Sequence, residues 1–285
     1  MATDDSDSDS ANGSQTTSES GVSSPSSGSG LTSILATALA LLRGRPLLFV
    51  PFAVAGALGA ASTAVRLASP YPVGLAPFPE GGLVRLSLPF IPQIEPTVEM
   101  GPAILTGMKP RFLVAFVGWQ VAISAATAVA FAGCLWLAAA DTDGIMPPLD
   151  RVAWLVAYVV VIDSVLFGVL FLSGQWASTG VGLALVALLV LAPFLVWLFV
   201  APALIVLDGK RPIAAAIESL DYAVASPGAI LVMLVGLGYV GYALTGVSRL
   251  ASSPTVGAAL ATVVSATVAG TAHAVAVAAL YQVGS

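Results

Sequence analysis

The chain has 285 residues, of which 58% are hydrophobic and only 9% are charged, and its mean hydropathy is +0.97. Soluble domains are about half apolar and about a quarter charged, so this composition excludes a water-soluble globule and makes lipid the main solvent. The formal charge is -5, from 15 acidic and 10 basic residues, and no basic patch indicates a nucleic-acid partner.

The N-terminal segment, residues 1–30, consists mostly of Ser, Gly, Thr, Asp and Asn. Such a segment cannot bury enough apolar surface to offset its ordering entropy, so the sequence predicts a disordered acidic, Ser-rich tail. It has no positively charged start that leads into an apolar run, so it is not a typical signal peptide. Asp-rich segments combined with few lysines, here only Lys109 and Lys210, are typical of a protein from a salt-loving archaeon.

The remainder, residues 31–285, is predicted to be an integral membrane domain with an all-α, polytopic helix-bundle fold. Six apolar stretches are long enough, at a rise of about 1.5 Å per residue, to cross a hydrocarbon core roughly 30 Å thick. The fourth stretch is longer than needed, which predicts that it tilts, kinks at Pro193 or ends before Pro202. The predicted spans cover residues 46–65, 112–138, 152–172, 179–207, 229–247 and 256–281.

Two amphipathic segments, residues 31–42 and 212–225, are predicted to be interfacial helices that lie in the plane of the membrane surface. Each precedes a proline, Pro46 or Pro227, and each is followed by a span rich in small residues. With six spans, this internal repeat places both surface helices on one side of the membrane. On the second helix, apolar residues mark one face and charged residues face water; the apolar set is Ile213, Ala216, Ile217, Leu220 and Val224.

A long Pro-rich connection, residues 67–110, joins the first two spans, and its prolines rule out a continuous helix. Residues 82–90 alternate enough to predict a short strand. The many apolar residues predict a segment that lies on the bilayer or caps the bundle. A partner-binding or lid role is the alternative.

The stretch PALIVLDGKRPIAAAIESLDYAVASPGAILV, from Pro202, combines the end of a span, an Asp-Gly turn, a Ser-containing amphipathic helix and a new span. This pattern resembles uncharacterised multi-pass membrane proteins of halophilic archaea, and its layout is similar to the membrane domain attached to some glycerophosphodiester phosphodiesterases. The resemblance covers residues 31–284 in layout and residues 202–235 in motif. It implies an architecture and transfers no catalytic residue.

The sixth span carries a row of small residues at i+4 spacing, which predicts a central helix in close contact with its neighbours. The row consists of Ala258, Thr262, Ala266, Gly270, Ala274 and Ala278. Small-residue faces of this kind also favour homo- or hetero-oligomers. The lipid bilayer is the other expected partner.

Asp163 in the third span and His273 in the sixth are the candidate intramembrane polar site, together with Gln120. A carboxylate near the bilayer centre is expensive and should be neutral, paired or in contact with a wet cavity. Antiparallel spans place Asp163 and His273 at comparable depth, so one hypothesis is that they pair or share a water. The alternative is that each makes a structural contact between helices. Gln120, Ser124 and Thr127 form a stripe that should face other helices.

No motif of a hydrolase, a P-loop enzyme or a zinc protease is present, and the single cysteine, Cys134, lies in an apolar run. We therefore expect no enzyme, no cofactor and no metal. The leading prediction is a non-enzymatic membrane scaffold or accessory component. The alternative is a small-solute or proton-coupled transporter that uses Asp163 and His273. The cell membrane is the expected location, with a cytoplasmic N-terminus because the tail lacks an export signal; the basic residues divide equally and give no orientation.

Overall fold

The computed structural model describes residues 27–69, 74–75, 92–99, 108–139, 144, 146–176 and 181–284. In this part of the chain the only strands are β1 (Gly74–Leu75) and β2 (Val98–Glu99), a two-residue antiparallel pair. Everything else of regular structure is helical, which confirms the all-α prediction. The strand predicted at residues 82–90 and most of the predicted tail lie outside the described residues.

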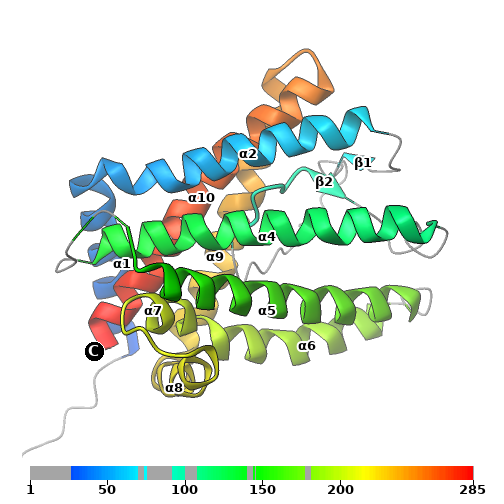
Figure 1. The fold of residues 1–285 in the computed structure, drawn as a ribbon. Helices are drawn as coiled ribbons and strands as arrows, with labels where there is room; N and C mark the ends of the chain where they lie inside the picture. Colours follow the sequence, from blue (N-terminus) through cyan, green and yellow to red (C-terminus); the bar gives the residue numbers. More distant parts are fainter. Residues whose placement is uncertain are drawn as a thin grey trace, which may run out of the picture.

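Apart from the long connection between α2 and α4, the helices are separated by short breaks (Figure 1). They are α1 (Ser27–Gly44), η1 (Pro46–Leu48), α2 (Phe49–Ala68), α4 (Pro110–Ala138), α5 (Leu149–Trp176), α6 (Val181–Leu198), α7 (Ala201–Val206), α8 (Pro212–Ala225), α9 (Pro227–Thr245), η3 (Gly246–Leu250) and α10 (Pro254–Gly284). Four α-helices begin at a proline: α4, α8, α9 and α10. Proline suits this place because the first amides of a helix have no intrahelical partner.

Six helical stretches of the described chain are long and apolar enough to cross a membrane. They are Pro46–Ala68, Pro110–Ala138, Leu149–Gly168, Leu189–Val206, Pro227–Leu250 and Pro254–Gly284. They fall on the six apolar stretches of the sequence. The chain therefore has the architecture of a multi-pass membrane protein.

Helix α10 packs along α2 and also contacts α1, α4 and α9. All six members of its small-residue row are buried, which confirms the central position predicted for this helix. The approach is close enough that a Cβ on Gly56 of α2 would lie 3.1 Å from the carbonyl oxygen of Val263. A Cβ on Gly270 would lie 2.4 Å from the ring of Phe52. Small residues on both helices allow this close approach.

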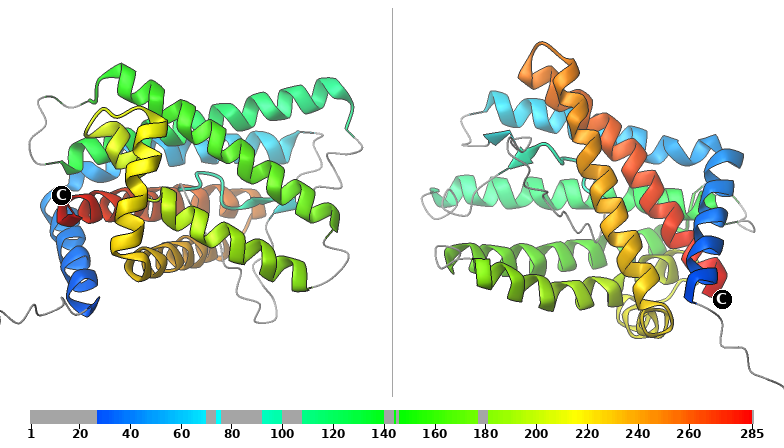
Figure 2. Two further views of the ribbon diagram at one scale, coloured as in Figure 1. Left: turned by 90° about the horizontal axis from the view of Figure 1, so that it is seen from below. Right: turned by 180° about the vertical axis from the view of Figure 1, so that it is seen from behind.

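Helices α1 and α8 lie at the same end of the bundle, near the C-terminal end of α10 (Figures 1 and 2). In Figure 1, α8 is seen end-on while α4, α5 and α6 run across the view, so α8 crosses these helices. This arrangement agrees with the sequence repeat, which places both surface helices on one side. Helix α1 begins at Ser27, inside the segment predicted as tail.

The fourth span is not one continuous helix. Helix α6 runs through Pro193 and ends at Leu198, and the short α7 begins at Ala201 after a two-residue break. The break belongs to Pro202, which has no amide for the carbonyl of Leu198 and whose ring clashes with a helical carbonyl at that position.

The long connection does more than cover the bundle. Residues 92–97, which we call the inserted segment, lie between α2 and α4 in Figure 1. Within it Ile94 is only 1% exposed, and a Cβ on Gly59 of α2 would lie 2.0 Å from the carbonyl oxygen of Ile94. Gly59 lies nine residues before the end of α2, roughly 13 Å along the helix axis. These residues therefore pack against α2 inside the bundle, whereas the sequence predicted a connection on the bilayer or over the bundle.

Candidate functional site

Asp163 of α5 is half-buried and accepts a hydrogen bond from the hydroxyl of Ser124 of α4, with an oxygen-to-oxygen distance of 2.6 Å. Both residues lie at the middle of their helices, where lipid offers no hydrogen-bond partner. Ser124 belongs to the predicted polar stripe and is 4% exposed. The contact joins two antiparallel spans through one side chain from each.

His273 of α10 is 1% exposed and packs among aromatic rings. Its ring stacks on Phe199, with a centroid distance of 5.3 Å, and meets Phe131 edge-on at 5.6 Å. The Nε2 atom is buried and has no hydrogen-bond partner among the described residues. His273 thus fills an apolar position between α4 and the break that follows α6.

The predicted pairing of Asp163 with His273 is therefore absent from the structure. Their α4 neighbours, Ser124 and Phe131, are seven residues apart, roughly 10 Å along the helix. Gln120 lies one turn before Ser124, is half-buried, and makes no hydrogen bond to the described part of the chain. The three predicted residues do not form one site.

A second polar arrangement supplies hydrogen bonds to backbone groups at the break between α6 and α7. The hydroxyl of Ser219, on α8, donates to the carbonyl of Trp197 at 2.6 Å and accepts from the amide of Val200 at 3.2 Å. The indole of Trp197 donates to the carbonyl of Ala216 at 2.7 Å. Ser219 is fully buried. Unpaired buried backbone groups are costly. The Ser219 hydroxyl therefore stabilises the break in the helix and holds α8 against it.

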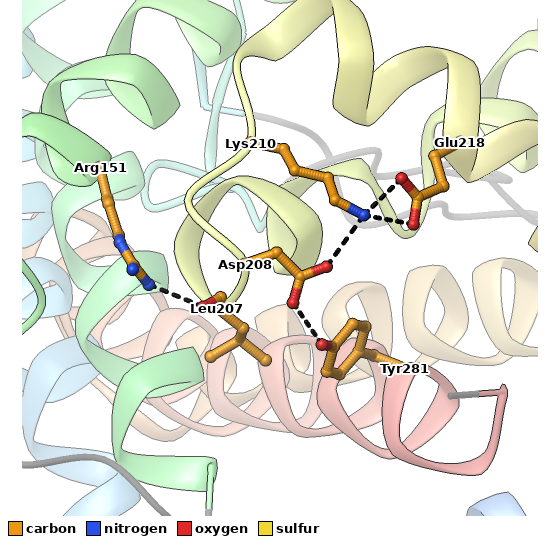
Figure 3. Close-up of polar contacts among 6 residues, drawn as sticks. All are labelled: Arg151, Leu207, Asp208, Lys210, Glu218 and Tyr281. Atoms are coloured by element: carbon orange, nitrogen blue, oxygen red, sulfur yellow. Dashed lines mark hydrogen bonds and ion pairs between the residues drawn. The ribbon is translucent and has the colours of Figure 1, made fainter.

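The turn from α7 to α8 is held by a charged cluster (Figure 3). Lys210 forms an ion pair with Asp208 at 3.2 Å and a contact with Glu218, while the Tyr281 hydroxyl donates to Asp208. The hydrogen bond to Glu218 raises the pKa of Lys210. Every carboxylate in this cluster already has a partner from the chain itself.

Arg151 holds the same turn from α5. It donates to the carbonyls of Val206 at 2.9 Å and Leu207 at 2.7 Å, which are orphan acceptors at the end of α7. Its guanidinium lies so close to Gly209 that a Cβ there would be 3.0 Å from Nε. Gly209 also has a φ of 69°, a backbone conformation that favours glycine.

Arg45 likewise binds carbonyl groups at the end of α4, at the same end of the bundle. It donates to the carbonyls of Leu137 at 2.8 Å and Ala139 at 3.1 Å, where α4 ends. A cation at a helix C-terminus is stabilised by the helix dipole as well as by the hydrogen bonds. Both Arg45 and Arg151 thus stabilise helix ends.

A charged cluster that no sequence pattern indicated lies at the opposite end of α2. Arg66 of α2 forms an ion pair with Glu95 of the inserted segment at 3.1 Å, and the two side chains are 11% and 9% exposed. Ser62 donates to Glu95 and accepts a hydrogen bond from the indole of Trp119 at 2.7 Å. The Arg66 guanidinium also lies over the rings of Phe116 and Trp119. Burial raises the pKa of Glu95, while Ser62 and Arg66 oppose that shift.

Among the described residues, no group of three or more His, Cys, Asp and Glu side chains is arranged to hold a metal ion. Cys134 is buried, and its sulfur contacts the carbonyl of Leu48 at 3.5 Å. No family model, no curated protein and no solved structure matches this chain.

Replacing Ser219 with alanine should destabilise the protein by about 2–3 kcal/mol, because the Trp197 carbonyl and the Val200 amide would both be left buried without a partner. The measurement is the unfolding free energy in detergent. Ser226→Ala is the matched control, since Ser226 precedes α9 without making a side-chain cap. Equal stability of the two variants would show that the hydroxyl of Ser219 does not stabilise the break.

Proposed function

We propose that the protein is a non-enzymatic, multi-pass component of the cell membrane that acts as a scaffold or accessory subunit. The observation that carries the proposal is how the polar side chains are used. Ser219, Arg45 and Arg151 each bond backbone groups at a helix break or a helix end, and Asp163 bonds a neighbouring span. These groups hold helices together, and they do not converge on one another as the side chains of a reactive site would.

The surface of α8 supports the same proposal. The helix packs on the bundle with its small residues Ala215, Ser219 and Ala223. Its large apolar residues face outward, with Ile213 78% and Val224 72% exposed. An apolar face held at the end of the bundle, between the last residue of one span and the first of the next, suits the acyl–headgroup boundary of a bilayer. With six spans, the N-terminal tail and the C-terminus lie on one side, which we propose is the cytoplasm.

The transport alternative now depends on Asp163 alone. Its carboxylate lies at mid-span, is half-buried and has Ser124 as its only described hydrogen-bond partner. A carboxylate in that position, with no cation beside it among the described residues, is the feature that a proton or cation path would use. His273, enclosed by two aromatic rings, gives no support to such a path.

A thermal-shift screen of the purified protein against small solutes and cations, repeated on Asp163→Asn, separates the two functions. The scaffold proposal predicts that no solute raises the melting temperature in an Asp163-dependent way. It also predicts that Asp163→Asn itself costs less than about 1 kcal/mol, because asparagine keeps an acceptor for Ser124 without a charge. Ser124→Ala serves as the control for the hydrogen bond. A solute whose shift disappears in Asp163→Asn would favour transport and contradict the scaffold.

A further inference from the structure

One face of α2 presents three polar side chains to the interior of the bundle: Ser62, Thr63 and Arg66. Ser62 and Arg66 are one turn apart, and Thr63 precedes Arg66 by three residues, so each of the two hydroxyl residues is a helical neighbour of Arg66. Their residues are 5%, 0% and 9% exposed. The face is therefore withdrawn from water, in a helix that is long and apolar enough to cross a membrane.

This face is chemically complementary to a carboxylate. Arg66 supplies the positive charge and Ser62 supplies a hydroxyl donor, which Trp119 orients through its indole N–H. Phe116 and Trp119 form aromatic walls beside the guanidinium, with centroid distances of 5.7 Å and 5.9 Å. A guanidinium forms strong charge-assisted hydrogen bonds with a carboxylate, and aromatic faces attract the same cation.

The carboxylate in this position is that of Glu95, and it engages only some of the hydrogen-bond donors on this face. Nη2 of Arg66 is ion-paired with Glu95 but makes no geometrically acceptable hydrogen bond, and Oγ1 of Thr63 has no partner among the described residues. Glu95 reaches the face on the inserted segment, which is not part of any helix or strand. That segment is attached by the contact of Ile94 with Gly59 and by the hydrogen bond between Thr97 and Thr262 at 2.9 Å.

We propose that Ser62, Thr63 and Arg66 form a carboxylate-binding site that Glu95 occupies in the absence of ligand. A free or lipid carboxylate takes the place of Glu95, gains the unused donors of Arg66 and Thr63, and releases the inserted segment. This site is independent of the scaffold proposal and of Asp163.

The test follows the position of the inserted segment in the full chain, reconstituted in nanodiscs. In the Ile94→Cys variant the introduced thiol replaces a side chain that is 1% exposed, and its rate of reaction with a maleimide reports withdrawal of the segment. The unsubstituted protein, whose buried Cys134 is its only thiol, gives the background. We expect sodium acetate or sodium octanoate to accelerate labelling severalfold, and sodium chloride at the same ionic strength or acetamide to have no effect. Acceleration by both carboxylates indicates a free solute, and acceleration by octanoate alone indicates a lipid.

A second measurement tests the face without the segment's own carboxylate. In Glu95→Ala, acetate should raise the melting temperature, and in Glu95→Ala/Arg66→Gln it should not. If acetate rescues Glu95→Ala but neither carboxylate changes labelling, the pair is a structural ion pair and the proposal is overturned. It is also overturned if neither experiment responds to carboxylate. Thr97→Cys provides an alternative reporter if Ile94→Cys does not fold.

Discussion

Replacing Gly59 with alanine should cost about 3 kcal/mol of stability, at the upper end of the range for overpacking, although alanine is the better helix former. The added Cβ would lie 2.0 Å from the carbonyl oxygen of Ile94 and 3.0 Å from its carbonyl carbon. These are backbone atoms, which cannot rotate away as a side chain can. The inserted segment must therefore move outward, and its contacts with α2 and α10 must weaken. Thermal or SDS-induced unfolding in detergent measures the loss.

Gly118 of α4 is the matched control for Gly59. It also lies inside a long apolar helix, but nothing is within 4 Å of the place where its Cβ would be. Gly118→Ala should leave stability unchanged or raise it by up to about 1 kcal/mol through helix propensity alone. If the two alanine variants were equally stable, the inserted segment would not be packed against Gly59.

The helices were predictable because their signals are local. A run of apolar residues and the prolines that begin the helices are read directly from neighbouring positions, and α8 has the predicted bounds, Pro212–Ala225. The central place of α10 was also predictable, since its row of small residues repeats at helical spacing. These features depend on the chemistry of one segment at a time.

The candidate site was not predictable by the same means. Depth along a span suggested that Asp163 and His273 meet, but depth does not say which way each helix is rotated about its axis. The structure turns Asp163 toward Ser124 and His273 toward Phe131 and Phe199. Lone polar residues in different spans therefore need rotational information before they can be paired.

The pairing of Arg66 with Glu95 left no local signal either. The two residues are separated by a Pro-rich connection without helical periodicity, and Arg66 directly follows the predicted span at residues 46–65. The one available indication was Glu95 itself, an acidic residue that follows a mostly apolar stretch, Phe90-Ile91-Pro92-Gln93-Ile94. A charge in such surroundings requires a partner if the stretch is buried.

Ser219 is a residue of a surface helix that forms hydrogen bonds inside the bundle. Its hydroxyl lies on the small-residue face of α8 and completes the hydrogen bonding of a span broken by Pro202. The large apolar residues of α8 remain exposed on the other side of the helix. A periodicity that separates only apolar from charged positions does not reveal this third face.

Breaking the Arg66–Glu95 pair should have the largest effect of any charge substitution in the described chain. Arg66→Met or Glu95→Leu alone should cost about 3–5 kcal/mol, because each leaves one buried charge without its partner. The double variant Arg66→Met/Glu95→Leu should be close to the parent in stability, since two apolar side chains of similar size replace the pair without a desolvation cost. The unfolding free energies of the four proteins form a double-mutant cycle, and a coupling near zero would contradict a direct interaction.

Arg111→Met is the control for removing a cation from the same end of the bundle. Arg111 is exposed and lies over Phe112, so this substitution should change stability by no more than about 0.5 kcal/mol.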